Sequence, residues 1–527
     1  MKRILLVLLF IVAFSFVNAQ FKSIAEGPAF KEPVSGFAKI LQMKNGNTMF
    51  ICITVKKGID VRIYDAAHKE TVVTNFEPDY GKLKGGKIEG VFEINGDAVL
   101  MLSLMDSSTP ILYRLIVDGK TGNLKEQVQL AQLDKVTFGD RFAMTYGNVP
   151  MPNFFVRKDP NSDNYALVMF NTFESERSKR IEIVTYGPDN KEASRAYYAS
   201  PNEKYKYLRY VDMAVLGNTK VCVLAYGYNT AHSGGKESEL ILANLDKRAK
   251  SVSFTELGFT KDMVVDAGVV RYNPVIKSLI LVADVKSEHK ENEYAPVIAI
   301  VDPFEKKILR VDVLSPSDRI NKYSKDGFTG LPENLFINDN GTFTVVSEEV
   351  TVRTRSSQYG TDINTELGDM AIVNYSKTGE LIDDYIVRKS QILDNFALGL
   401  FYHSHRQGTA QMLENGTQYK SFAYLDGKNQ SYILFNDTER NNDAQESGSL
   451  VTIRGVSGSD GFYYPIKGEN PVPKRAYVFG QPAEKRDHNL GLFAISDYDR
   501  NTNVYTTLKL SKESGKKEVQ IVWLQPN

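Results

Sequence analysis

A four-strand pattern of hydrophobic and polar positions recurs along most of this chain. Its clearest copy runs from residue 87 to residue 133. Two apolar segments, 88–94 and 98–104, flank the turn Asn95-Gly96-Asp97, and two further strands flank a second turn at 118–123. Asn-Gly and Asp-Gly favour tight hairpin turns, because these residues tolerate the positive φ angles that such turns require. The segment is therefore predicted to form a four-stranded antiparallel sheet.

The second strand of each copy is apolar at nearly every position. Such continuous apolar runs are typical of strands that lie between two neighbouring sheets, since both of their faces are buried. Copies of four strands at intervals of roughly 45–60 residues are typical of the blades of a β-propeller. The second strands are predicted at 48–55, 98–104, 165–170, 220–226, 278–283, 342–347, 431–435 and 491–495.

We therefore expect an all-β protein, a β-propeller of about eight four-stranded antiparallel blades. The alternative is seven blades with a cap, because the last two copies are the least regular. One propeller domain is expected over 37–527, and the N-terminal segment 20–36 could complete a blade and close the ring. A long inserted connector is expected at 389–416, whose deletion should leave folding intact but remove partner binding. The blades are predicted at about 37–78, 87–133, 150–200, 206–257, 264–315, 331–388, 417–467 and 475–524.

Over essentially all of its mature length, the chain resembles the β-propeller superfamily. The resemblance is architectural. The Gly-His…Trp-Asp signature of WD40 repeats is absent, Trp523 is the single tryptophan, and the double-glycine pattern of kelch repeats does not recur. Together with its N-terminal segment, the chain looks like secreted or periplasmic bacterial propeller proteins. Such a resemblance implies an architecture but no particular chemistry.

The first 19 residues are predicted to be a signal peptide. Lys2 and Arg3 precede an apolar run at 4–16, and Val17-Asn18-Ala19 forms an A-x-A-like site with cleavage between Ala19 and Gln20. A membrane anchor is the alternative, but the run is shorter than the ~20 residues that a bilayer span requires. We therefore expect an extracytoplasmic protein, secreted or periplasmic, with no transmembrane segment after cleavage.

Composition argues against binding to nucleic acid or an anionic membrane, and the positions of the cysteines argue against a disulfide. Lys plus Arg and Asp plus Glu number 64 each, so no strong net field attracts nucleic acid or an anionic membrane. The two cysteines, Cys52 and Cys222, lie in apolar runs of the first and fourth predicted blades. A disulfide requires Cα atoms within about 7 Å, and these blades lie far apart across the ring. We therefore predict two free, buried thiols despite export.

One face of the predicted propeller carries long polar loops, and we call it the long-loop face. It comprises the loops between second and third strands and the connectors between blades, whereas the opposite face has short turns. Loops longer than about 12–15 residues are uncommon in compact domains and tend to be functional or disordered. This face is therefore predicted to hold the binding site. Its members are 174–179, 228–235, 286–293, 348–369, 436–448, 497–501 and the connectors 134–149, 316–330 and 389–416.

Two groups on this face are candidate sites for a ligand or partner. His403 and His405 would share one side of an extended chain beside Arg406, a geometry that can serve a metal. No further ligand has a telling spacing, so a polar role at the rim is the favoured interpretation. Arg353 and Arg355 could bind a carboxylate or phosphate, because each guanidinium group can donate two parallel hydrogen bonds. The alternative for these arginines is a solvated, salt-bridged β-ribbon.

A third candidate group is Asp497, Tyr498 and Asp499, which would follow the eighth central strand. A carboxylate pair with an aromatic ring could contact a sugar or coordinate calcium. No calcium-loop spacing is present, so we expect no cofactor and keep calcium as the alternative. The turn at 338–342 resembles a calcium motif but is better explained as a hairpin.

No local catalytic motif supports an enzyme. G-x-S-x-G, H-E-x-x-H, phosphate-binding loops and paired C-x-x-C motifs are all absent from the sequence. We expect a non-catalytic, exported scaffold that binds a protein or glycan partner through the long-loop face. The alternative is a hydrolase or lyase acting on glycans or peptides near the central channel. An enzyme predicts converging carboxylates in an axial pocket, whereas a scaffold predicts a plugged channel and exposed aromatic patches.

Overall fold

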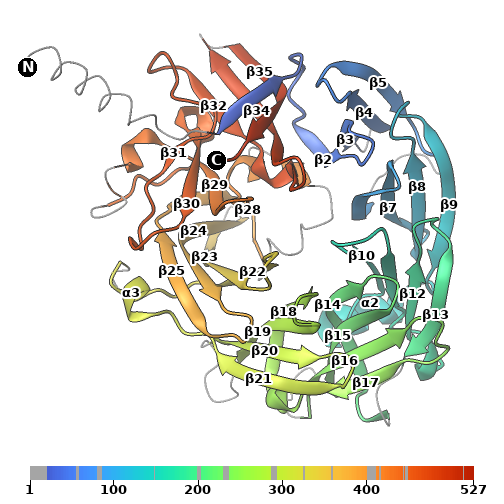
Figure 1. Cartoon of the computed structure of the whole chain (residues 1–527). Helices are drawn as coiled ribbons and strands as arrows, with labels where there is room; N and C mark the ends of the chain where they lie inside the picture. Colours follow the sequence, from blue (N-terminus) through green and yellow to red (C-terminus); the bar gives the residue numbers. More distant parts are fainter. Residues whose placement is uncertain are drawn as a thin grey trace, which may run out of the picture.

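The chain folds as an eight-bladed β-propeller in the computed structural model (Figure 1). Eight antiparallel sheets are arranged around a central axis, which confirms the all-β architecture and the larger of the two expected blade numbers. The structure describes residues 21–54, 58–79, 86–147, 149–198, 203–229, 237–286, 294–323, 327–357, 360–399, 411–414, 417–442, 444, 449–513 and 516–527. The predicted signal peptide and its cleavage site lie outside these residues.

The first four blades follow the chain in order, and each runs from an inner strand to an outer strand. Blade 1 is formed by β2 (Ser35–Gln42), β3 (Thr48–Thr54), β4 (Gly58–Tyr64) and β5 (Glu70–Phe76). Blade 2 is formed by β6 (Lys87–Ile94), β7 (Asp97–Asp106), β8 (Thr109–Val117) and β9 (Leu124–Gln132). Blade 3 is formed by β10 (Asn153–Lys158), β11 (Tyr165–Phe170), β12 (Ile181–Tyr186) and β13 (Glu192–Tyr198). Blade 4 is formed by β14 (Tyr207–Leu216), β15 (Lys220–Tyr228), β16 (Glu239–Asp246) and β17 (Ser253–Glu256).

The next three blades repeat the same order. Blade 5 is formed by β18 (Val264–Asn273), β19 (Ser278–Lys286), β20 (Tyr294–Asp302) and β21 (Lys307–Val313). Blade 6 is formed by β22 (Leu331–Ile337), β23 (Phe343–Ser357), β24 (Gly360–Tyr375) and β25 (Leu381–Val387). Blade 7 is formed by β28 (Ala423–Asp426), β29 (Ser431–Asp437), β30 (Asp460–Ile466) and β31 (Ala476–Tyr477).

Blade 8 combines the two ends of the chain. It contains β32 (His488–Gly491), β34 (Val504–Glu513), β35 (Lys516–Gln525) and, as its outer strand, β1 (Lys22–Glu26). The blue β1 lies beside the red β35 in Figure 1. Trp523 of β35 is fully buried and donates its indole N–H to the Thr48 hydroxyl of blade 1 at 2.9 Å. The ring is therefore closed by strand pairing and by packing across the blade 8–blade 1 boundary.

The eighth central strand was predicted in the wrong place. The seven other predicted second strands coincide with β3, β7, β11, β15, β19, β23 and β29. In blade 8 the second strand is β34, and the predicted segment 491–495 contains the end of β32 and the 3₁₀ helix η9 (Phe493–Ile495). The apolar side chains of this segment are buried as expected, but beside the inner strand of the blade rather than within its second strand.

Helical segments are short and lie in the connections. Among the described residues, the longest is α2 (Phe138–Gly147), between blades 2 and 3. None of the helices among the described residues is both long and apolar enough to cross a bilayer. The remaining ones are α3 (Asp318–Asn321), η2 (Arg177–Lys179), η4 (Gly258–Thr260), η6 (Thr417–Tyr419), η7 (Glu439–Asn441) and η8 (Val456–Gly458).

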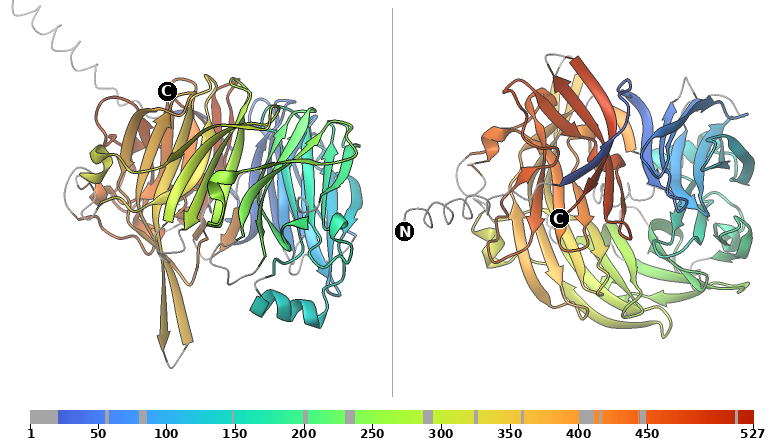
Figure 2. Two further views of the ribbon diagram at one scale, coloured as in Figure 1. Left: turned by 90° about the horizontal axis from the view of Figure 1, so that it is seen from below. Right: turned by 45° about the horizontal axis from the view of Figure 1, so that its top comes forward.

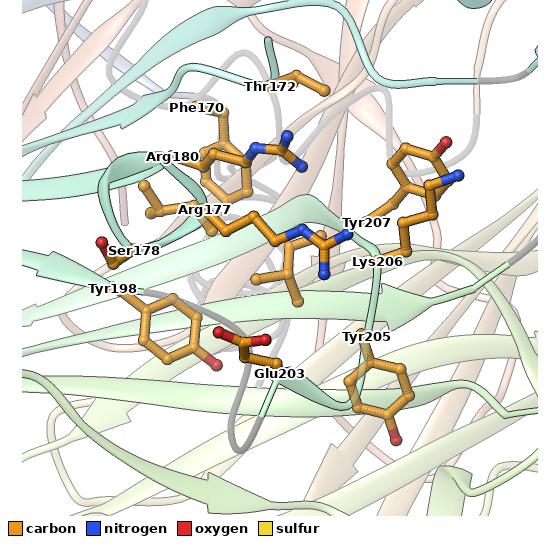
Figure 3. Close-up of a pocket in the computed structure, with 12 residues that line it drawn as sticks. Phe170, Thr172, Arg177, Ser178, Arg180, Tyr198, Glu203, Tyr205, Lys206 and Tyr207 are labelled. Atoms are coloured by element: carbon orange, nitrogen blue, oxygen red, sulfur yellow. The ribbon is translucent and has the colours of Figure 1, made fainter. Parts of the chain in front are cut away.

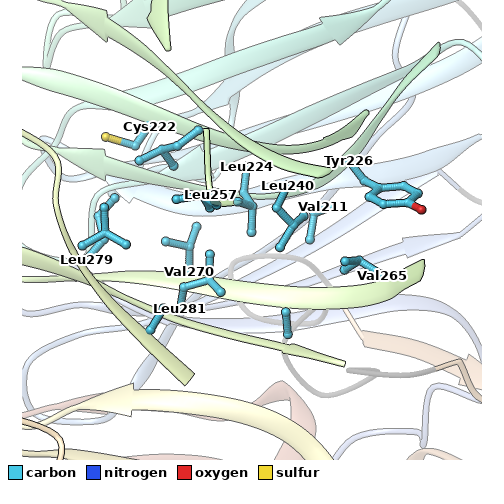
Figure 4. Packing of buried hydrophobic residues seen from close by; sticks show 14 of the residues in the cluster. Val211, Cys222, Leu224, Tyr226, Leu240, Leu257, Val265, Val270, Leu279 and Leu281 are labelled. Atoms are coloured by element: carbon cyan, nitrogen blue, oxygen red, sulfur yellow. The ribbon is translucent and has the colours of Figure 1, made fainter. Parts of the chain in front are cut away.

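The core consists of apolar layers between successive blades. Figure 4 shows the layer between blades 4 and 5, where Leu224 and Leu240 lie opposite Val270 and Leu281. Each central strand contributes side chains to the layers on both sides, which explains its continuous apolar sequence. At about 25 cal/mol per Å² of buried apolar area, these layers supply the main stabilising term of the ring.

Both cysteines are free and buried, as predicted. Cys52 lies on β3 of blade 1 and Cys222 on β15 of blade 4. Burial raises the pKa of each thiol to about 12. Since the thiolate is the reactive form, we expect neither thiol to react with iodoacetamide in the native protein at pH 8. Both should react after denaturation, as mass spectrometry would show, and rapid labelling of the native chain would contradict this packing.

The inserted connector contributes two strands to the ring. β26 (Gln391–Asp394) pairs with β24 of blade 6, and β27 (Gln411–Glu414) pairs with β2 of blade 1. The Lys389 ammonium and the Glu348 carboxylate form a 2.5 Å ion pair with both side chains fully buried. Contrary to the sequence-based prediction, we therefore expect deletion of 389–416 to disturb folding, because it would remove paired strands and a buried ion partner.

Candidate functional site

Two structures project from the long-loop face (Figure 2). One is the helix α2, and the other is the β-ribbon formed by the extended ends of β23 and β24. In the left view of Figure 2, the teal helix and the gold-brown ribbon both point away from the ring on the same side. The loop predicted at 348–369 is thus mostly regular strand, and the connector predicted at 134–149 contains a helix.

The helix α2 is anchored at its N-terminal end. The Thr137 hydroxyl accepts from the Asp140 N–H at 3.3 Å, and the Asp140 carboxylate accepts from the Thr137 N–H at 2.8 Å. This reciprocal pairing satisfies donors that a helix start leaves free. The Arg141 guanidinium donates to the Ser108 hydroxyl of blade 2 at 2.6 Å. The helix is therefore attached to the turn between β7 and β8.

The aromatic side of α2 has no partner among the described residues. No residue of the helix is buried. Phe138, Phe142 and Tyr146 are 86%, 60% and 69% exposed, and the rings of Phe142 and Tyr146 lie 4.6 Å apart. Spacings of four residues place all three rings along one side of the helix. We call these three residues the aromatic ridge.

The two candidate arginines lie on the projecting ribbon. Arg353 is largely exposed and forms a 2.9 Å ion pair with the partly exposed Glu366 on the adjacent strand. Arg355 is exposed on the same strand, opposite Asp362 in the register. At Arg353 the ribbon is therefore salt-bridged, as the alternative interpretation expected. A ligand role for Arg353 or Arg355 stays a prediction. His403, His405 and Arg406 lie outside the described residues.

Asp497, Tyr498 and Asp499 lie on the opposite face of the ring from the face predicted for them. They form β33 (Asp497–Asp499), which pairs with the start of β34 and belongs to the first-strand side of blade 8. The next residue, Arg500, forms 2.5 Å ion pairs with Asp339 and Asp426. Those two aspartates lie in or beside the turns between first and second strands of blades 6 and 7. This group therefore belongs to the short-turn face.

Hydrogen bonds within the ring occupy the two carboxylates of this group. Asp497 accepts from the Gln42 N–H of blade 1 at 2.7 Å, and Asp499 accepts from the Asn501 N–H at 2.9 Å. Burial raises the pKa of Asp497. Among the described residues, no three His, Cys, Asp or Glu side chains are grouped as a metal would require. A calcium or sugar role for the group stays untested.

Buried charges, rather than apolar or small side chains, connect the inner strands of blades 3 to 6. The Asp212 carboxylate accepts from Arg157 at 2.5 Å and from Arg271 at 2.6 Å, and Arg271 also contacts the Asn334 amide oxygen at 3.4 Å. Burial alone would raise the pKa of Asp212, but the two guanidinium groups hold it below its ordinary value. These side chains pair with one another across neighbouring blades, so the network has the character of a structural joint.

One buried carboxyl group stands apart from such networks. Asp284 on β19 is 0% exposed, and neither of its carboxyl oxygens has a hydrogen-bond partner among the described residues. Burial, and secondarily the nearby Asp266 carboxylate, raise its pKa from 3.8 to about 8. A raised pKa is a property of many catalytic acids. Here, however, the group is fully enclosed and lines no described pocket, so the geometry does not favour the hydrolase alternative.

A pocket opens on the long-loop face between blades 3 and 4. Its cavity volume is about 70 Å³, and it is open to solvent. Figure 3 shows the guanidinium groups of Arg177 and Arg180 among the rings of Phe170 and several tyrosines. Its lining comes from the loop after β11, from the end of β13 and from the connector into β14. The lining residues are Phe170, Thr172, Arg177, Ser178, Arg180, Ile181, Tyr198, Glu203, Tyr205, Lys206, Tyr207 and Leu208.

The aromatic ridge and the pocket were both missed as sites. The connector 134–149 and the loop 174–179 were predicted only as long polar segments. The four-residue spacing of Phe138, Phe142 and Tyr146 could have identified the helix. The pocket is harder to find, because it joins segments that become neighbours only when blades 3 and 4 pack together.

Comparisons with known proteins assign no family or activity to this chain. No family model matches this chain, and no curated protein matches it. A structure of Chaetomium thermophilum Sqt1 bound to the N-terminus of a ribosomal protein is 10% identical, with a TM-score of 0.40, and the match covers 96% of this chain and 100% of that one. A Fusarium graminearum α-L-arabinofuranosidase is 10% identical, with a TM-score of 0.34, over 71% of this chain and 92% of that one. A Bacteroides caccae protein of unknown function is 8% identical, with a TM-score of 0.27, over 67% of this chain and 94% of that one.

Proposed function

We propose that this protein is an exported, non-catalytic scaffold that binds a protein partner through its long-loop face. The observation that carries the proposal is the aromatic ridge of α2. Three aromatic side chains at 60–86% exposure are unusual on a helix that projects from a folded ring. Contiguous exposed apolar side chains on a soluble protein often mark an interaction site. The N-terminal pattern of Lys2-Arg3, an apolar run and Val17-Asn18-Ala19 supports export.

The shape of the ridge favours a protein partner over a glycan. Aromatic side chains four residues apart on a projecting helix can enter an apolar groove, which is a common mode of protein recognition. Aromatic residues also dominate the energetic centres of protein interfaces. Asp140 and Arg141 flank the ridge and are held by their contacts to Thr137 and Ser108. The ridge is therefore presented in one orientation, which lowers the entropic cost of binding.

Replacing the ridge should remove partner capture without unfolding the ring. In the triple variant Phe138→Ser, Phe142→Ser and Tyr146→Ser, we expect partner recovery in a pull-down from the cell envelope to fall by at least ~10-fold, since interface anchors commonly contribute about 2 kcal/mol or more each. No residue of α2 is buried, so the melting temperature should change by no more than about 2 °C, because surface substitutions rarely exceed ±0.5 kcal/mol.

The outer strand of blade 5 provides a matched control. Leu309, Val311 and Val313 on β21 are also exposed apolar side chains. The control variant replaces these three residues with serine and should capture the partner like the unmodified chain. Loss of capture by the control variant, with capture retained by the ridge variant, would place the interface on the blade edge and refute the proposal.

A further inference from the structure

The pocket between blades 3 and 4 has an excess of positive charge. Arg177, Arg180 and Lys206 all line it, and no ion pair to any of the three is found in the described part of the chain. Of the acidic side chains nearby, Glu176 pairs with Lys179 at 2.6 Å and Glu239 pairs with Lys204 at 3.3 Å. Glu203 is the one carboxylate in the described lining, against three cations. Guanidinium groups match carboxylates through two parallel hydrogen bonds. The charges that line the pocket therefore favour an anionic ligand.

A hydrogen bond orients Arg180, and the positive charge of Arg177 repels it. The Arg180 Nε donates to the Glu174 carbonyl oxygen at 2.8 Å, which orients the guanidinium group. Burial, followed by repulsion from Arg177, lowers the pKa of Arg180. Two like charges held close together repel each other, and a bound anion would relieve that repulsion. The arrangement is preorganised for binding, because the protein itself fixes one of the two donors.

Two hydroxyl groups at the pocket wall have no hydrogen-bond partner in the part of the chain that the structure describes. They belong to Tyr198, which is 4% exposed, and to Thr172. Burial raises the pKa of Tyr198, so its hydroxyl keeps its proton and can donate. An unsatisfied buried hydroxyl is costly, and few occur without a reason. Both residues line the pocket, so a small rotation of either side chain on ligand binding would give its hydroxyl a partner.

The remaining walls are flat and apolar. Phe170, Tyr205 and Tyr207 present rings to the pocket, and Ile181 and Leu208 complete its apolar lining. The Tyr205 hydroxyl donates to Glu239 at 3.0 Å, which fixes the position of that ring. Rigid aromatic walls of this kind suit a ring-shaped ligand with one apolar face.

We infer that this pocket binds an acidic sugar residue of a glycan, such as a uronate. The carboxylate would bind Arg177 and Arg180, the sugar hydroxyls would bind Tyr198 and Thr172, and the C–H face of the ring would pack on the aromatic wall. An acidic peptide would satisfy the arginines but offers fewer hydroxyl groups for the two unpartnered side chains. The inference goes beyond the proposed protein partner and does not depend on it, because the pocket and α2 are separate features of the same face.

Binding of defined probes to the full mature chain tests this inference. The probes are trigalacturonate, a glucuronate disaccharide and sialyllactose, with galactotriose as the neutral control and a triglutamate peptide as the acidic control. We expect at least one acidic sugar to bind in calorimetry, at least ~10-fold more tightly than either control, because hydrogen bonds to a charged group add most to affinity. Failure of all three acidic sugars, or equal binding of triglutamate or galactotriose, would overturn the inference.

Two substitutions connect binding to the pocket. Arg177→Gln should weaken binding of the acidic sugar by ~10-fold or more, and Tyr198→Phe by ~3-fold or more, as expected for loss of a charged and a neutral hydrogen bond. Because the Tyr198 hydroxyl has no partner, Tyr198→Phe should not lower the melting temperature. Arg248→Gln, an exposed arginine in the turn after β16 on the opposite face, is the matched control. Unchanged affinity in both pocket variants would overturn the assignment of the site.

Discussion

Asp284→Asn is expected to stabilise the protein at pH 7 and to leave its stability unchanged at pH 4. The Asp284 carboxyl is fully buried without a partner, and its pKa rises from 3.8 to about 8 on folding. Between these two values, the folded state keeps the proton while the unfolded state releases it. Since the unfolded state then binds fewer protons, the wild-type protein loses stability as pH rises from about 4 to about 8.

The size of this effect follows from the pKa shift. One pKa unit corresponds to about 1.4 kcal/mol, so Asp284 lowers the free energy of unfolding at pH 7 by about 2–4 kcal/mol. Asparagine resembles the neutral acid in shape and does not ionise, so the variant should lack this loss. Urea denaturation of both chains at pH 4 and pH 7 measures the difference. Equal changes at the two pH values would show that Asp284 is not held in its protonated form.

Lys389→Met is expected to destabilise the protein by about 3–5 kcal/mol. The substitution leaves the Glu348 carboxylate buried without its partner cation, and removal of one member of a buried ion pair typically has this cost. Lys389 also lies near the rings of Phe422 and Phe435 of the blade 7 region. Its loss should therefore loosen the boundary between blades 6 and 7, which chemical denaturation of the variant would measure.

A double variant separates the ion pair from simple loss of packing. Lys389→Met combined with Glu348→Leu should recover a large part of the stability, because no buried charge is left. Arg353→Met is the exposed control, since it breaks the surface pair with Glu366 and should cost less than about 1 kcal/mol. A Lys389→Met effect as small as that of Arg353→Met would contradict the buried pair.

The repeating strands could be predicted from sequence because each central strand is buried on both faces. Cys222 and Leu224, for example, lie in a continuous apolar run that packs between neighbouring blades. The same rule misplaced the last central strand. The true strand, β34, buries Thr506 and Thr507, whereas the apolar run around Phe493 packs beside the inner strand. An apolar run predicts burial, and it does not by itself identify which strand of the blade is buried.

The sequence predicted which face carries the candidate site, but not which residues form it. Long connections indicated the long-loop face, but Asp497 and Asp499 were assigned to it because the eighth blade was shifted by one strand. The connector 389–416 was expected to be dispensable, yet it supplies β26, β27 and a buried lysine. Strand pairing between distant segments leaves no local pattern, so sequence spacing could not reveal these contacts. Tyr198 and Arg177 meet in the pocket for the same reason.

Hydrogen exchange on the captured complex tests the central claim most directly. The partner recovered with the intact chain is kept bound while amide exchange is compared with that of the free protein. The account predicts that partner binding slows exchange in α2 (Phe138–Gly147) and in the adjoining turn between β7 and β8 on the long-loop face. Protection confined to the short-turn face, for example at the hairpin 338–342, with α2 unchanged, would contradict it.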